Sequence, residues 1–115
     1  MASQAEITIP RPLVNEGSSF TATAYFRTRS TSAASTPTTV HYRIDCLTTG
    51  TEIADWTSVS ASSSVSISIT GTHNAIQSDE NDVEVKQLTV SADKDLSTQV
   101  RQTVRWKVSN LFGSP

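Results

Sequence analysis

The sequence contains few of the residues that commonly carry out catalysis or cross-link a fold. Cys46 is the single cysteine, so the chain cannot form an internal disulfide, and a fold that depends on a cystine is excluded. The two histidines, His41 and His73, stand outside any recognisable catalytic motif. Serine is abundant, but it needs an adjacent base to act as a nucleophile. We therefore expect no catalytic residues, no cofactor and no enzymatic activity.

The sequence also lacks a strong net charge and a long hydrophobic run. A formal net charge of −2 argues against a nucleic-acid partner, which requires a basic face. No segment reaches the roughly 18 apolar residues that span a membrane, so we expect no membrane partner. The first ten residues, MASQAEITIP, have neither the basic nor the apolar region of a secretory signal, which predicts synthesis in the cytoplasm.

Hydrophobic residues make up 36% and aromatic residues 6% of the 115 residues, whereas serine and threonine together reach about 30%. A chain of this length forms one domain with one core. We therefore expect a single domain over residues 1–115, with residues 1–12 as an N-terminal arm and residues 111–115 as a short C-terminal tail. Threonine suits the polar outer face of β-strands, and runs of serine suit the connections between them.

Apolar and polar residues alternate along most of the chain with the period of a β-strand. In the segment 40–46, Val40 and Ile44 fall on one side with Cys46, which predicts a buried thiol, whereas His41 falls on the solvent side. Seven candidate strands are found at 6–9, 18–27, 40–46, after the turn at 48–50, at 64–70, 83–92 and 99–110. Short, regularly spaced strands without any helical period predict an all-β, antiparallel β-sandwich.

Three details of this sandwich can be predicted. The strand at 6–9 is stopped by Pro10 and Pro12, which predicts an edge strand or an arm. Small alanines between Phe20 and Phe26 indicate that a bulky group packs opposite, for which we propose Trp56. In the segment 83–92 the apolar residues change parity, which predicts a bulge or crossover near residues 86–87.

Several groups of residues are candidates for interaction. The acidic turn of Asp79, Glu80 and Asp82, with Asn81 and Glu84, could bind calcium, but it lacks the spacing of a calcium loop, so we favour a solvated turn and expect no metal. The basic stripe of Arg101, Arg105 and Lys107 either meets an acidic partner or prevents edge-to-edge pairing. The candidate interaction residues are Tyr25, Arg29 in the long loop 28–39, the three residues of the basic stripe, and Phe112 in the tail.

The order of these elements, with TVHYRID on a central strand, SVSISIT, VEVKQLTVSAD and VRQTVRWKVSN, resembles fibronectin type III and related immunoglobulin-like sandwiches over nearly the whole chain. More specifically, the segments NEGSSFTATAYFR, TPTTVHYRIDCLTTGTEI and GTHNAIQSDEND resemble small tailed-bacteriophage proteins with this fold. The resemblance implies a single immunoglobulin-like sandwich of about seven strands.

The same resemblance implies a structural virion protein, made in the cytoplasm of a bacterial host and docked in many copies on the capsid, as a decoration, or on the tail or head–tail junction. Its partners would be other virion proteins and further copies of itself, reached through edge strands, the arm and the tail. The alternative is a free-standing binding module for carbohydrate or a host protein, acting through Tyr25 and the loops at one end of the sandwich.

Overall fold

The computed structural model describes residues 4–78 and 80–110. Within them it contains eight β-strands and no helix, so no helix is present that could cross a membrane. The strands are β1 (Gln4–Thr8), β2 (Leu13–Asn15), β3 (Phe20–Arg27), β4 (Val40–Cys46), β5 (Thr51–Val59), β6 (Ser64–Ile69), β7 (Val83–Ala92) and β8 (Val100–Ser109). The short strand β2 is the one that the sequence pattern did not predict.

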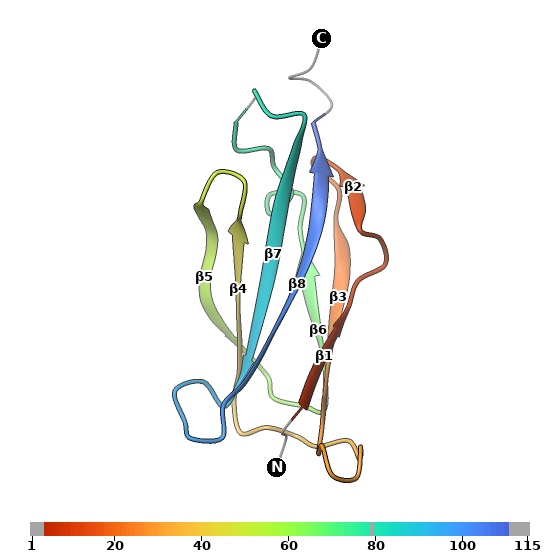
Figure 1. Cartoon of the computed structure of the whole chain (residues 1–115), viewed down its shortest axis with the longest axis vertical. Helices are drawn as coiled ribbons and strands as arrows, with labels where there is room; N and C mark the ends of the chain where they lie inside the picture. Colours follow the sequence, from red (N-terminus) through yellow and green to blue (C-terminus); the bar gives the residue numbers. More distant parts are fainter. Residues whose placement is uncertain (1–3, 79, 111–115) are drawn as a thin grey trace.

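The strands form two sheets, which Figure 1 shows as two layers. One sheet has three strands in the order β1-β3-β6, and the other has five in the order β2-β8-β7-β4-β5. All pairs are antiparallel except β2 with β8, which is parallel. The molecule measures 52 × 24 × 20 Å, with its strands running along the long axis. The all-β prediction is confirmed, and the arrangement is β-sandwich-like.

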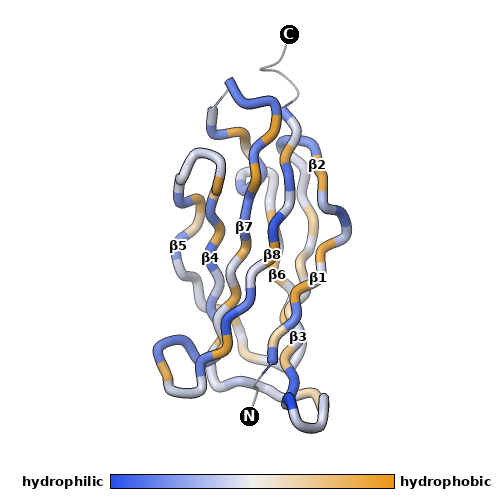
Figure 2. The backbone as a smooth tube through the Cα atoms, in the orientation of Figure 1, coloured by the Kyte–Doolittle hydropathy of each residue, from blue (hydrophilic) through white to orange (hydrophobic). Residues whose placement is uncertain are grey.

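The alternation of apolar residues along the strands builds one core between the sheets. Figure 2 shows hydrophobic and hydrophilic residues following one another along the strands. In β6 the pattern is regular, because Val65, Ile67 and Ile69 are buried and the serines between them are exposed. Cys46 is buried as predicted. The largest apolar core side chains are Trp106, Phe26, Ile44, Ile67, Ile69 and Leu88.

The bulky side chain of the core is Trp106, and the prediction that Trp56 packs opposite the alanines was wrong. Trp106 is 1% exposed, and its ring meets Phe20 edge to face at a centroid distance of 5.3 Å. Its indole Nε1 donates a hydrogen bond to Asn74 Oδ1 at 2.7 Å. Trp56 is half-buried and does not belong to the core. The strand β8 therefore supplies the large aromatic side chain of the core, and it contacts Phe20 of β3.

The bulge predicted in β7 is also absent. The strand pairs with β8 in one unbroken register from Val83 to Ala92, and with β4 over Lys86 to Ala92. The inward positions of its first half are filled by Glu84 and Lys86, both fully buried. Parity is therefore maintained along β7, and the apparent change arose because two charged residues occupy core-facing positions.

Two connections are fixed by side chains that bond to a distant loop. Asn74 Nδ2 donates to the backbone carbonyl of Ser18 at 2.7 Å, and the backbone carbonyl of Asn74 accepts from the N–H of Gly17 at 3.2 Å. Asp93 Oδ1 accepts from the N–H groups of Thr38 and Thr39 at 2.7 and 3.2 Å. The end of the long loop before β4 is thus hydrogen-bonded to the β7–β8 hairpin.

Candidate functional site

The outer face of the five-stranded sheet gathers charged and aromatic side chains from β4, β5, β8 and the β7–β8 loop. Strand register arranges them in cross-strand rows. His41, Ser91 and Arg101 form one row. Arg43, Thr89 and Thr103 form the next, followed by Asp45, Gln87 and Arg105. Thr89 and Ser91 are buried although they face outward, so larger side chains of the neighbouring strands lie across them.

Trp56 faces outward by ordinary alternation, because the next residue, Thr57, pairs with Tyr42 on the core side of β4. Between Tyr42 and Ile44 the register of β4 advances by two residues while that of β5 advances by three, from Thr57 to Ala54. A second irregularity follows between Ile44 and Asp45. A bulge of this kind changes which side of the sheet a residue faces. Ala54, which has the same parity as Trp56, therefore lies opposite Ile44 beside the core.

The Trp56 ring has cations from three elements around it. Its centroid lies 5.8 Å from Arg43 Cζ on β4, 5.3 Å from Arg101 Cζ on β8 and 5.2 Å from Lys94 Nζ in the β7–β8 loop. These distances are within the range of cation–π attraction, which holds the ring against the sheet. We call this face, defined by Arg43, Trp56, Lys94 and Arg101, the Trp56 face.

Acidic residues border the Trp56 face along β4 and β5. Arg43 donates two hydrogen bonds to Asp45, from Nε at 3.0 Å and from Nη2 at 2.7 Å, and this pairing raises the pKa of Arg43. Arg43 Nη2 also lies 3.7 Å from Glu52 Oε1. A hydrogen bond shared with Asp55 raises the pKa of Glu52, whereas the N–H of Trp56 lowers the pKa of Asp55. Arg43 is thus fixed in orientation by its acidic neighbours.

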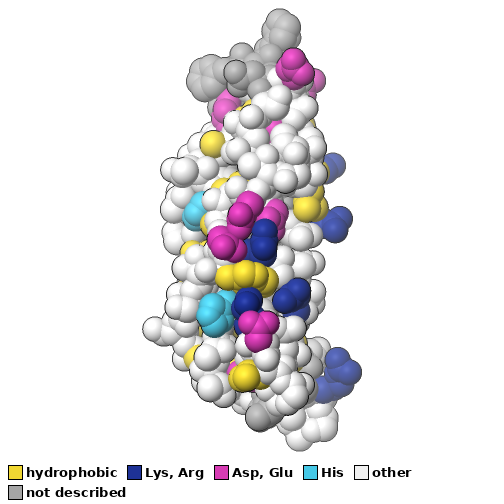
Figure 3. Space-filling model, turned by 90° about the vertical axis from the view of Figure 1, so that its left-hand side faces the viewer, with side chains coloured by type: hydrophobic (Ala, Val, Ile, Leu, Met, Phe, Trp, Pro, Cys, Tyr) yellow, Lys and Arg dark blue, Asp and Glu magenta, His cyan; other side chains and the backbone are white. Residues whose placement is uncertain are grey.

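Asp95 and His41 lie beside the basic members of the Trp56 face. Lys94 Nζ pairs with Asp95 Oδ2 at 2.9 Å, and this contact lowers the pKa of Asp95. His41 lies on the outward side, as predicted, and its Nδ1 is buried without a hydrogen-bond partner in the described part of the chain. Figure 3 shows a hydrophobic patch with acidic side chains around a basic one on one side, and basic and histidine side chains with an acidic one on the other. Both signs of charge therefore lie around the Trp56 ring, largely as ion pairs.

The structure does not bring the predicted interaction residues into one site. Tyr25 lies half-buried on the outward side of β3, in the opposite sheet. Arg29 is exposed in the turn that follows β3, and Phe112 lies outside the described residues. The basic stripe is confirmed as an exposed, outward set on β8, but only Arg101 reaches Trp56, whereas Arg105 Nε bonds to Gln87 Oε1 at 2.9 Å.

Glu84, the last carboxylate of the acidic turn, is buried in the interior. Glu84 Oε1 accepts from the N–H of Gln77 at 2.7 Å and from Lys86 Nζ at 3.1 Å. Its Oε2 accepts from the N–H of Ser78 and from Asn81 Nδ2, each at 3.0 Å. Glu84 is therefore not available to a calcium ion. Asp79 lies outside the described residues, among which no group of acidic, histidine or cysteine side chains could hold a metal.

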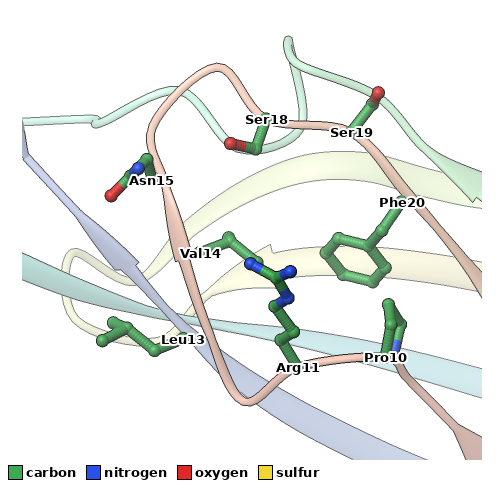
Figure 4. Close-up of a pocket in the computed structure, with 8 residues that line it drawn as sticks. All are labelled: Pro10, Arg11, Leu13, Val14, Asn15, Ser18, Ser19 and Phe20. Carbon is green, nitrogen blue, oxygen red and sulfur yellow. The ribbon is translucent and has the colours of Figure 1, made fainter.

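A second candidate is a hollow of about 460 Å³ between the β1–β2 connection and the start of β3. It is lined by Pro10, Arg11, Leu13, Val14, Asn15, Ser18, Ser19 and Phe20. Figure 4 shows Arg11 extending past Val14, with Leu13 on the other side of the chain. The hollow is open to solvent and holds one ionisable side chain, so it offers less to a partner than the Trp56 face.

Sequence reasoning placed Trp56 in the core and so missed the Trp56 face, because it did not follow parity along β5. Ile53 and Trp56 have opposite parity, so in a regular strand they cannot both face the core. That parity was the signal that one of them faces outward. The cross-strand approach of Arg101 to Trp56 depends on strand order and could not be read from spacing.

Comparison with protein-family models, curated proteins and solved structures finds no match for this chain.

Proposed function

We propose that the chain is an immunoglobulin-like domain that serves as a structural protein of a tailed-bacteriophage virion, docked in many copies on the capsid or on the tail or head–tail junction. The sheet orders support the fold, because one sheet of three strands and one with β8, β7, β4 and β5 side by side is the arrangement of fibronectin type III domains, to which β2 is an addition. The three segments that resemble phage proteins form β3, the β4–β5 hairpin and the β6–β7 connection. They support the virion setting.

The observation that carries a docking role is the Trp56 face. Tryptophan, tyrosine and arginine are the residues most enriched among those that dominate the energy of protein interfaces. Here a half-buried tryptophan lies between two arginines, and Arg43 is already fixed by Asp45. A side chain that is ordered before binding loses less entropy when the partner arrives. We therefore assign virion docking to the Trp56 face.

The test measures first whether the protein is present in purified particles, and then whether recombinant protein binds to particles that lack it. Trp56→Ala should weaken this binding by at least tenfold, since loss of a central tryptophan typically costs about 2 kcal/mol or more. Tyr25→Ala is the matched control, because it removes a half-buried aromatic side chain from the opposite sheet. Absence of the protein from particles, or equal binding by both variants, would contradict the proposal.

The free-standing binding module is the second candidate, and it is favoured by the hydrogen bonds within the loop after β3. The N–H of Thr28 donates to the carbonyl of Ala33, and the N–H of Ser32 donates to the carbonyl of Thr28, so this loop folds back on itself. Deletion of residues 31–36 should abolish binding to carbohydrate or a host protein if this loop is the recognition element. Retained binding in the deletion variant would count against it.

A further inference from the structure

The edges of the two sheets differ in how they are protected. A free edge presents unpaired N–H and C=O groups, and proteins usually protect it with charges, prolines, bulges or a covering segment. The β5 edge has two register irregularities and carries Glu52 and Asp55. The β2 edge is three residues long and follows Pro10 and Pro12. The β1 edge is covered by β8, from which Gln102 Nε2 donates to the carbonyl of Ala5 at 3.3 Å.

The fourth edge, β6, has none of these protections. Its six residues pair with β3 in one unbroken register and include no charged residue and no proline. It is the outermost strand of its sheet, and no other described strand pairs with it. Its side chains on the outer face are the exposed serines Ser64, Ser66 and Ser68.

The register shows which backbone groups of β6 face the open edge. The N–H of Phe26 donates to the carbonyl of Ser63 at 2.8 Å, so these two residues form a hydrogen-bonded pair. Bonded and non-bonded pairs alternate in an antiparallel ladder. Val65, Ile67 and Ile69 therefore bond to β3, whereas Ser64, Ser66 and Ser68 direct their N–H and C=O groups away from it. The N–H of Ser64 donates to Ser62 Oγ at 3.4 Å, and it would exchange this partner on pairing. No backbone bond from Ser66 or Ser68 to any other described segment fills these positions.

We propose that this edge pairs with β6 of a second copy of the chain, antiparallel about a two-fold axis at Ser66. Two three-stranded sheets would then join into one sheet of six strands. In this register Ser66 faces its own counterpart, and Ser64 faces Ser68 of the other copy. Each outward N–H of one copy then meets an outward C=O of the other.

The choice of a second copy rests on the self-complementarity of the strand. The two-fold axis places Val65 opposite Ile67 on the core side of the joined sheet and serine opposite serine on the outer side. Apolar groups therefore meet apolar groups, and no charges are brought together. An interface that uses the same patch on both copies is isologous and closes as a dimer. The Trp56 face lies on the other sheet and stays free.

The experiment follows the mass of the full chain in solution by light scattering over a wide concentration range, and the wild type should shift from monomer toward dimer. Ser66→Lys and Ser66→Glu each place like charges opposite one another at the axis, so each variant alone should remain monomeric. An equimolar mixture of the two should form the mixed dimer, detectable by native mass spectrometry. Thr103→Lys, an exposed change of the same charge on the other sheet, should dimerise like the wild type.

A third variant tests the backbone bonds themselves. Ser66→Pro removes the N–H at the axis from both copies without removing a bond to β3, so the dissociation constant should rise roughly 30-fold. Circular dichroism of each variant checks that the monomer is folded. If Ser66→Pro does not fold, the proposal is tested by Ser66→Lys and Ser66→Glu, alone and mixed. A wild type that stays monomeric, a dimer that the Ser66 variants do not weaken, or a Lys–Glu mixture that stays monomeric would overturn the proposal. A monomer that instead captured an extended foreign peptide would also overturn it.

Discussion

Glu84 occupies a position where a carboxylate is stable only because of the bonds that it accepts. Burial by itself raises the pKa of Glu84, but the N–H of Gln77, the side chains of Asn81 and Lys86 and the N–H of Ser78 outweigh it and lower the pKa to about 2. The Sγ of Cys46 lies 3.7 Å from the same carboxylate. The interior of this end of the molecule thus contains a satisfied ion pair rather than an apolar contact.

The low pKa of Glu84 predicts that acid destabilises the fold. The unfolded chain takes up a proton near pH 4.5, the ordinary value for a glutamate, whereas the folded chain resists it until about pH 2. The contribution of Glu84 is therefore complete above about pH 4.5 and is lost as the pH falls to about 2. It amounts to about 3 kcal/mol in the free energy of unfolding. Urea denaturation at pH values between 7 and 2 measures it.

Two substitutions isolate that effect. Glu84→Gln keeps the shape of the side chain but cannot ionise, so the free energy of unfolding should change less between pH 4.5 and pH 2. At pH 7 the free energy of unfolding should fall by about 3–5 kcal/mol, because Lys86 loses its buried carboxylate partner. Glu80→Gln, an exposed change in the same turn, should keep the wild-type slope. Equal slopes in wild type and Glu84→Gln would assign the acid sensitivity to other groups.

Single-residue patterns in the sequence predicted the core well where strands are regular. The inward positions of β4 and β6 and the buried thiol of Cys46 follow directly from a period of two. Glu84 and Lys86 were missed because charged residues are almost never fully buried unless they are paired. Their pairing depends on the loop carrying Gln77 and Ser78, which only the folded chain brings beside them.

At the scale of elements, the connections β2–β3 and β6–β7 approach each other closely at glycines. A Cβ on Gly71 would lie 2.5 Å from the carbonyl oxygen of Gly17, which is too short for a contact with backbone. The same two loops are joined by the hydrogen bond from Gly17 to Asn74, and Asn74 also accepts from Trp106. Contact between the loops therefore positions a hydrogen-bonding partner for the core tryptophan.

We predict that Gly71→Ala separates these loops and lowers the free energy of unfolding by about 2–3 kcal/mol, because Asn74 then bonds less well to Ser18 and Trp106. Gly50→Ala is the matched control. It adds the same methyl group at a turn with φ of 71° and nothing within 4 Å, so only the backbone strain of about 1 kcal/mol applies. Chemical denaturation compares the two variants, and an equal loss in both would show that the loop contact contributes little.

Element order was predictable only in part. The alternation of each segment predicted seven of the eight strands, but not β2, whose three residues are too few to show a period. Nor could spacing show that β2 leaves the first sheet to pair with β8, since that depends on contacts between residues about 94 positions apart. The Trp56 face depends on the strand order, which brings Arg43 of β4 and Arg101 of β8 near Trp56 of β5.

At the scale of the whole molecule, the two tryptophans report on opposite parts of one structure. Trp106 lies in the core between the sheets, whereas Trp56 lies on the outer face of the larger sheet. Because one core joins both sheets, a chain of this size should unfold in a single transition. Both tryptophans should then change their environment at the same denaturant concentration.

Two single-tryptophan variants test this, each followed in urea by fluorescence and by far-UV circular dichroism. In Trp56→Phe the signal comes from Trp106, and the two probes should give the same midpoint near that of the wild type. In Trp106→Phe the signal comes from Trp56, and the two midpoints should again coincide. The free energy of unfolding should be lowered by about 2 kcal/mol or more, because Asn74 Oδ1 loses the indole N–H and the core is underfilled. If Trp56 fluorescence instead changed at lower urea than the dichroism, the Trp56 face would open independently of the core. Docking would then have to order that face, and its arginines and tryptophan would no longer be fixed before the partner binds.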